Sequence, residues 1–160
     1  MRVAAVTGGV KRVLVSSPEY AARLATVSPD GRLIAYTSSE TNRIEVYVRQ
    51  LAEGATGRWE VSTAGGSQPV WSRDGRTLYY RDGQSVIAAS ITAGPSSINI
   101  TGQRVFAPDR YTLENTLNFG EMPDGRRLLM LATSGDAASF AVQLNWLEGV
   151  KARLATGRSR

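Results

Sequence analysis

The sequence predicts an all-β chain built from repeated four-stranded units, and three observations support this prediction. First, the tripeptide Asp-Gly-Arg occurs three times, at residues 30–32, 74–76 and 124–126. Second, 44 residues separate the first copy from the second, and 50 separate the second from the third. Third, short apolar and aromatic runs flank each copy, and Gly and Asp residues punctuate the chain between these runs. A period of about 40–45 residues is typical of the four-stranded blade of a β-propeller.

The first repeat predicts four strands, at residues 24–28, 32–37, 43–49 and 57–62. The third strand is the clearest, because apolar and polar residues alternate strictly along it. Successive side chains of a strand point to opposite faces. We therefore expect an apolar face and a polar face, formed by Ile44, Val46 and Val48 and by Glu45, Tyr47 and Arg49.

The second repeat predicts strands at residues 68–72, 76–81, 85–91 and 103–106. The third repeat supplies only three strands, at 117–121, 126–132 and 139–145. Residues 2–7 and 12–15 resemble the last two strands of a further unit, so we expect about three and a half blades. The expected divisions are trailing strands of an incomplete blade at 1–16, blade 1 at 17–63, blade 2 at 64–107, blade 3 without its outer strand at 108–147, and a basic C-terminal tail at 148–160.

Each Asp-Gly-Arg copy is expected to close the hairpin between the first two strands of its blade. Gly reaches the positive φ of a tight turn without steric cost, and the Asp carboxylate can accept hydrogen bonds from nearby backbone N–H groups. The Arg begins the next strand, where it is placed to pair with a carboxylate of a neighbouring turn. We interpret all nine residues as structural rather than catalytic: Asp30, Gly31, Arg32, Asp74, Gly75, Arg76, Asp124, Gly125 and Arg126.

Two stretches, residues 28–36 (SPDGRLIAY) and 65–76 (GGSQPVWSRDGR), resemble the WD40-like (PD40) propeller repeats of TolB-type proteins. The same repeats occur in the C-terminal sensor regions of bacterial serine/threonine kinases. Residues 47–49 and 144–148 (LNWLE) resemble the closing stretch of those kinase-linked propellers. The resemblance spans essentially residues 2–151. It implies a non-catalytic platform that binds protein or peptide partners, within a longer chain that lies outside the cytoplasm if it is TolB-like or a membrane kinase.

The repeats depart from the family pattern at two positions. Arg73 stands where the family usually has Pro, and Met122 stands where it usually has Ser. We expect the turns to survive both changes, because Gly75 and Gly125 are retained. The sequence contains no kinase motif: it has no Gly-rich phosphate loop, no His-Arg-Asp and no Asp-Phe-Gly.

The composition removes several kinds of catalytic site. The chain has no His and no Cys, so it lacks the usual general base near neutral pH and any thiolate nucleophile. We expect no cofactor, no metal and no catalytic residue. The rival interpretation is a propeller hydrolase or lactonase that uses carboxylates, with or without calcium, in a central channel. Its candidate carboxylates are Glu45, Glu60, Glu114 and Glu121.

Large aromatic residues either fill the space between blades or lie exposed for partners. We expect core packing for Trp71 and Trp146, and exposure for Tyr47 and Tyr111. The net charge of +5 comes mostly from Arg residues scattered along the chain, with one cluster at Lys151, Arg153, Arg158 and Arg160. Scattered Arg residues do not form the concentrated basic stripe of a nucleic-acid site, so we expect no nucleic-acid partner.

No apolar run reaches the roughly 18 residues of a membrane span, and the first residues are too short a stretch for a signal peptide. We therefore expect no membrane insertion and leave the compartment undetermined. Blade 3 without its outer strand would expose an unpaired strand edge, which invites another chain. We expect a partial ring, or half of a ring that is closed by self-association through such edges.

Overall fold

The computed structural model describes residues 2–7, 10–16, 19, 21–52, 54–83, 85–94, 97–106, 119–134 and 137–143. These residues form thirteen β-strands and no helix. In this part of the chain there is accordingly no helix that is long and apolar enough to cross a bilayer. The expected all-β class is confirmed.

The strands form four antiparallel sheets in which chain neighbours pair in order. The N-terminal sheet contains β1 (Arg2–Thr7) and β2 (Val10–Ser16). Blade 1 contains β3 (Ala22–Val27), β4 (Leu33–Ser38), β5 (Glu45–Gln50) and β6 (Arg58–Glu60). Blade 2 contains β7 (Ser67–Trp71), β8 (Thr77–Asp82), β9 (Ser85–Ala93) and β10 (Ile98–Phe106). Blade 3 contains β11 (Phe119–Glu121), β12 (Leu128–Ser134) and β13 (Ala137–Gln143).

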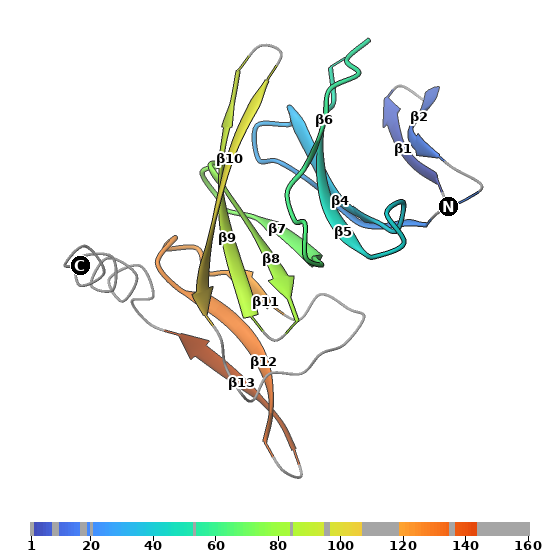
Figure 1. Cartoon of the computed structure of the whole chain (residues 1–160). Coiled ribbons are helices and arrows are strands. Elements are labelled where there is room, and N and C mark those ends of the chain that lie inside the picture. The colour runs from blue at the N-terminus through green and yellow to red at the C-terminus, as the bar shows by residue number, and fades with distance from the viewer. Residues whose placement is uncertain are drawn as a thin grey trace, which may run out of the picture.

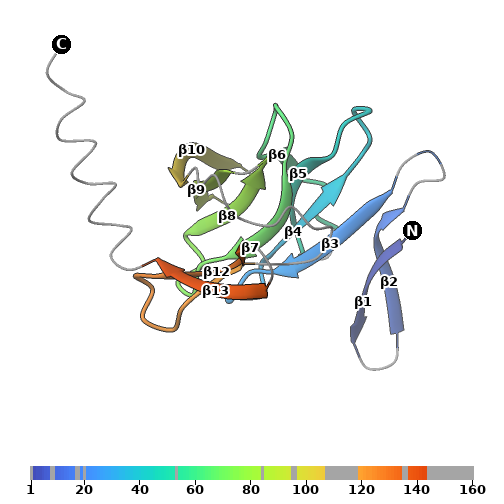
Figure 2. The same cartoon turned by 90° about the horizontal axis from the view of Figure 1, so that it is seen from below.

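The sheets lie side by side in chain order. The N-terminal sheet stands beside blade 1, blade 2 packs against the other face of blade 1, and blade 3 follows blade 2 (Figure 1). The view from below shows the same succession (Figure 2). The first strand of blade 2, β7, contacts the first strands of both neighbours, β3 and β11. The first strands therefore lie nearest the axis around which the blades are arranged.

An apolar core joins blade 1 to blade 2. Trp71 of β7 is 7% exposed, and its indole N–H donates to the carbonyl of Thr26 on β3 at 3.3 Å. The prediction that Trp71 packs in the core is thus confirmed. Removing large apolar side chains from water stabilises a fold by about 1.5–3 kcal/mol each. The buried members of this core are Leu33, Ala35, Val46, Val48, Trp71, Leu78, Tyr80, Ile87, Ala89 and Ile91.

A smaller core joins blade 2 to blade 3, formed by Tyr79, Val86, Phe119, Leu128 and Met130. The strand that supplies Tyr79 also supplies Arg81, which is 2% exposed. None of its three guanidinium nitrogens has a hydrogen-bond partner among the described residues. Burial accordingly lowers the pKa of Arg81. Arg81 pairs across the sheet with Val86, a member of this core, so it lies on the same face of blade 2. A buried charge without a partner is costly, and in the described part of the chain Arg81 is therefore a destabilising element of this boundary.

The expectation for residues 44–49 was wrong in two respects. Ile44, assigned to the apolar face, precedes β5 and is 54% exposed. Tyr47, expected to be exposed, is 2% exposed, because the second face of blade 1 is covered as well. Its ring stacks on Tyr36 at 5.9 Å between centroids, and burial raises its pKa to about 12. Alternation indicates a strand, but it does not reveal that both faces of a blade are buried.

The first strands of the two four-stranded blades, β3 and β7, each carry a β-bulge at the same place in the blade. The register shifts between Arg23 and Thr26 in β3, and between Ser67 and Val70 in β7. In each bulge a residue other than Gly has a positive φ, 50° for Leu24 and 52° for Gln68. Such values are uncommon for these residue types. The repetition shows that the bulge is part of the blade design, as bulges in sheets usually are.

Candidate functional site: the row of turns

The three Asp-Gly-Arg turns have one geometry. The N–H of Gly31, Gly75 or Gly125 donates to the carbonyl three residues earlier, at 2.8, 3.0 and 2.9 Å. Their φ values are 72°, 70° and 64°, in the region that favours Gly. The replacement of Pro by Arg73 and of Ser by Met122 leaves this geometry unchanged, as we expected.

In each turn the Asp carboxylate accepts a hydrogen bond from the backbone N–H of the following Arg. The distances are 3.1 Å at Asp30, 3.0 Å at Asp74 and 3.0 Å at Asp124. Hydrogen bonds to the ionised form lower the pKa of all three carboxyl groups, chiefly from the Ser28 hydroxyl at Asp30 and from the Arg N–H at the other two. Each carboxylate therefore serves as a hydrogen-bond acceptor within its own turn.

A buried Ser completes the first two turns. The Ser72 hydroxyl donates to Asp74 at 2.7 Å and accepts the N–H of Thr77 at 2.9 Å. Ser28 makes the equivalent contacts in the first turn. Met122 has no hydroxyl, and in the third turn Asp124 instead pairs with Arg127 at 2.5 Å. Among the described residues no ion pair joins Arg32, Arg76 or Arg126 to a neighbouring turn, contrary to the expected pairing.

The three turns form a continuous row. A Cβ atom built at Gly75 would lie 3.5 Å from Cδ of Pro29, so the first turn lies directly beside the second. The second turn reaches the third through Arg73, whose side chain donates to the carbonyl of Pro123 at 3.2 Å. Because Arg73 replaces Pro, it also has a backbone N–H, which donates to Glu121 at 2.7 Å. The departure from the repeat pattern thus links blade 2 to blade 3, a role that the sequence did not reveal.

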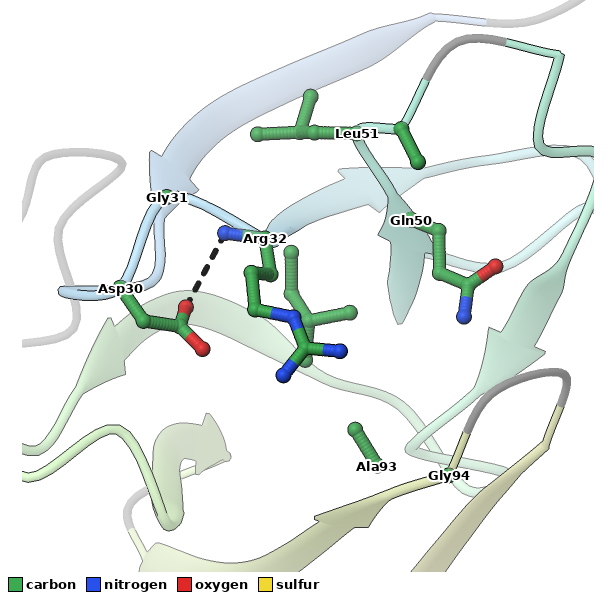
Figure 3. A pocket seen from close by; sticks show the side chains of 9 residues that line it. Asp30, Gly31, Arg32, Gln50, Leu51, Ala93 and Gly94 are labelled. Carbon is green, nitrogen blue, oxygen red and sulfur yellow. Dashed lines mark hydrogen bonds between the residues drawn. The ribbon is translucent and has the colours of Figure 1, made fainter.

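A pocket of about 310 Å³ lies beside the first turn, between blade 1 and blade 2 (Figure 3). The turn supplies one wall, the end of β5 and its following residues supply a second, and the end of β9 supplies the third. The side chains of Arg32 and Gln50 extend toward Ala93 and Gly94 (Figure 3). The lining residues are Asp30, Gly31, Arg32, Leu33, Gln50, Leu51, Ala52, Ala93 and Gly94.

A second pocket, of about 550 Å³, lies between the second and third turns. Its character is acidic, because Asp74, Glu121 and Asp124 contribute to its lining, against one cation from Arg73. Tyr79 donates its hydroxyl to Glu121 at 3.2 Å, and burial followed by the charge of Glu121 raises the pKa of that tyrosine. Among the described residues no three acidic side chains converge as a metal site.

The carboxylates of the rival hydrolase interpretation are engaged in structural contacts. Glu45 is 1% exposed and accepts from the Ser62 hydroxyl at 2.5 Å and from the Gly65 N–H at 3.0 Å. Glu60 accepts from the Tyr47 hydroxyl at 3.4 Å, and Glu121 makes the contacts given above. Of these three glutamates, only Glu121 lines either of the two pockets given above. Glu114, Trp146, Tyr111 and the cationic tail lie outside the described residues.

No protein-family model matches the chain, and no curated protein matches it. Solved structures do. A structure from work on two prolyl endopeptidases matches with a TM-score of 0.52 and 16% identity, over 86% of this chain and 23% of that one. The fold is a β-propeller. TolB from Acinetobacter baumannii matches with a TM-score of 0.40 and 20% identity, over 86% of this chain and 44% of TolB. The chain thus spans less than half the length of either structure.

Proposed function

We propose that this propeller segment is a non-catalytic interaction module whose row of turns binds a protein or peptide partner. The observation that carries the proposal is the continuity of the three turns, with an open pocket at each of two blade boundaries. Loops that a rigid scaffold holds in place are where binding residues are concentrated in proteins. Here the hydrogen bonds of the turns supply that rigidity, and the exposed side chains of the turns supply the contacts.

The two pockets differ in charge, which supports recognition of a partner with both acidic and basic side chains. The pocket beside the first turn balances one cation, Arg32, against one carboxylate, Asp30. The pocket between the second and third turns has three carboxylates against one cation. Opposite charges placed at separate points of a surface fix the orientation of a bound segment and exclude incorrect partners.

A library of displayed random peptides, selected against the full chain, tests the proposal. We expect recovered peptides whose binding, measured by fluorescence anisotropy, is weakened by Arg32→Ala or by Asp74→Asn. A parallel screen for ester, lactone and glycoside hydrolysis, with and without calcium, tests the rival. Turnover that is lost in Glu121→Gln would establish an enzyme and overturn the proposal, as would failure to recover any peptide that binds the turns.

We also propose that the chain associates with a second copy through strand edges. Blade 3 has three described strands, and among the described residues β13 pairs only with β12, whereas the equivalent strands β5 and β9 have partners on both sides. An unpaired edge offers N–H and C=O groups for addition of a strand. Light scattering behind a sizing column measures the mass directly: a dimer supports the proposal, and a compact, folded monomer contradicts it.

A further inference from the structure

Arg32 occupies a fixed position at the wall of the pocket beside the first turn. Its backbone N–H donates to Asp30 at 3.1 Å, and its carbonyl accepts the N–H of Leu51 at 2.9 Å. The residue is therefore held from both sides by its main chain, while its side chain is exposed. The guanidinium extends from the turn across the pocket toward Ala93 (Figure 3).

The guanidinium of Arg32 differs from several other arginines of the fold. Arg43, Arg58 and Arg127 each form an ion pair with a carboxylate. Arg32 forms no ion pair with any described carboxylate, and Asp30 contacts its backbone N–H rather than its side chain. The ligand that fits it best is a planar carboxylate, which a guanidinium can bind through two parallel hydrogen bonds.

The Asp30 carboxylate also lines the pocket, where it accepts hydrogen bonds from the Ser28 hydroxyl and the Arg32 backbone N–H. Apart from Asp30 and Gln50, the lining suits the carbon atoms of such a ligand. Leu33 and Leu51 contribute apolar surface, and Ala93 and Gly94 are small enough to leave space opposite Arg32. The volume of about 310 Å³ is several times the roughly 30 Å³ that one water molecule occupies in the liquid. An acidic side chain thus has both room for its methylene groups and a partner for its charge.

We propose that this pocket binds the side-chain carboxylate of a Glu or Asp residue in a partner peptide, and that Arg32 is the residue that binds this carboxylate. The inference rests on the proposed function, since it assigns the chemistry of one subsite on the row of turns.

Nuclear magnetic resonance titration of the isotope-labelled full chain detects even millimolar binding. The probe is an acetylated and amidated hexapeptide with two central Glu residues flanked by Gly and Ser, and its neutral counterpart carries Gln in place of Glu. We expect the Glu peptide to shift the resonances of Arg32, Leu51 and Gly94, and the Gln peptide to leave them unchanged. We further expect Arg32→Ala to raise Kd by at least about tenfold.

Two variants make the result specific. Arg76→Ala removes the arginine at the same position of the second turn and should change Kd by less than about twofold. Ala93→Leu fills the pocket without altering the turn, and should weaken binding as Arg32→Ala does. Equal binding of the two peptides, equal losses in Arg32→Ala and Arg76→Ala, or binding only of a neutral peptide with an unblocked C-terminus would overturn the proposal.

The outcome is separable from that of the proposed function. If library peptides bind to the acidic pocket and are insensitive to Arg32→Ala, the interaction module stands and the carboxylate subsite is wrong. If no library peptide binds the turns at all, the proposed function itself fails.

Discussion

The boundary between blade 1 and blade 2 differs from the boundary between blade 2 and blade 3 in the interactions that hold the blades together. The first contains ten buried apolar residues and is centred on Trp71. The second contains five among the described residues. It also contains hydrogen bonds to Glu121 from Tyr79 and Arg73, and the buried charge of Arg81, which has no described partner. Within the described residues, the first boundary contains the larger number of buried apolar side chains, and the second is the more polar of the two.

The largest expected effect comes from truncating Trp71. Changing Trp71→Ala should lower the free energy of unfolding by about 3–5 kcal/mol, because the change leaves a cavity in the larger core. Urea denaturation followed by circular dichroism measures this loss. Trp59→Ala is the control, since Trp59 is only half-buried on the outer strand of blade 1 and should cost less than half as much. Equal losses for the two variants would contradict the account of the first boundary.

Arg81→Met should raise the free energy of unfolding by about 1–3 kcal/mol. The change replaces a buried guanidinium, which has no described partner, by an apolar side chain of similar length. Arg76→Met, at an exposed position in the turn before the same strand, should change stability by less than about 0.5 kcal/mol. A clear loss of stability in Arg81→Met would show that the charge has a stabilising partner.

Tyr79→Phe should lower stability by about 1 kcal/mol, because it removes the hydroxyl that donates to Glu121. The matched control is Tyr80→Phe on the same strand, whose hydroxyl has no hydrogen bond among the described residues. The same denaturation experiment compares the two variants. If Tyr80→Phe proved as costly as Tyr79→Phe, the polar contact with Glu121 would not be what stabilises the second boundary.

The smallest expected effect is on how the free energy of unfolding depends on pH in acid. The pKa values of Asp30, Asp74 and Asp124 lie below the ordinary value of 3.8 in the folded chain. Their contribution to stability is therefore present above that value and is lost as pH falls through the lowered pKa values. We expect Asp74→Asn to reduce the slope of stability against pH below about pH 4. An unchanged slope would show that the hydrogen bonds of this turn do not govern the acid response.

The sequence predicted the local geometry of the chain well and its packing less well. The repeated Asp-Gly-Arg copies predicted the hairpins and their period, because a turn is fixed by a few neighbouring residues such as Gly31 and Asp30. The burial of Tyr47 was mispredicted, since burial depends on what covers the second face of a blade. Arg81 was missed as well, although an Arg directly after the apolar and aromatic residues of β8 was a visible signal.

The candidate site was predicted only in part. The positions of the turns were evident from the sequence, but the pockets beside them were not. A pocket forms where residues from different blades line the same space, as Arg32 and Ala93 do. A local sequence pattern does not predict which distant residues come close together. The one usable signal was the departure of Arg73 from the repeat, because a residue that replaces Pro gains a backbone donor.

Hydrogen–deuterium exchange of the full chain, with and without a peptide recovered from the displayed library, tests the central claim most directly. That claim is that the row of turns is the binding surface of the module. We predict slower exchange on binding at residues 28–33 and 72–77, with β6 and β10 unchanged. Protection confined to those outer strands, with no change at the turns, would contradict it.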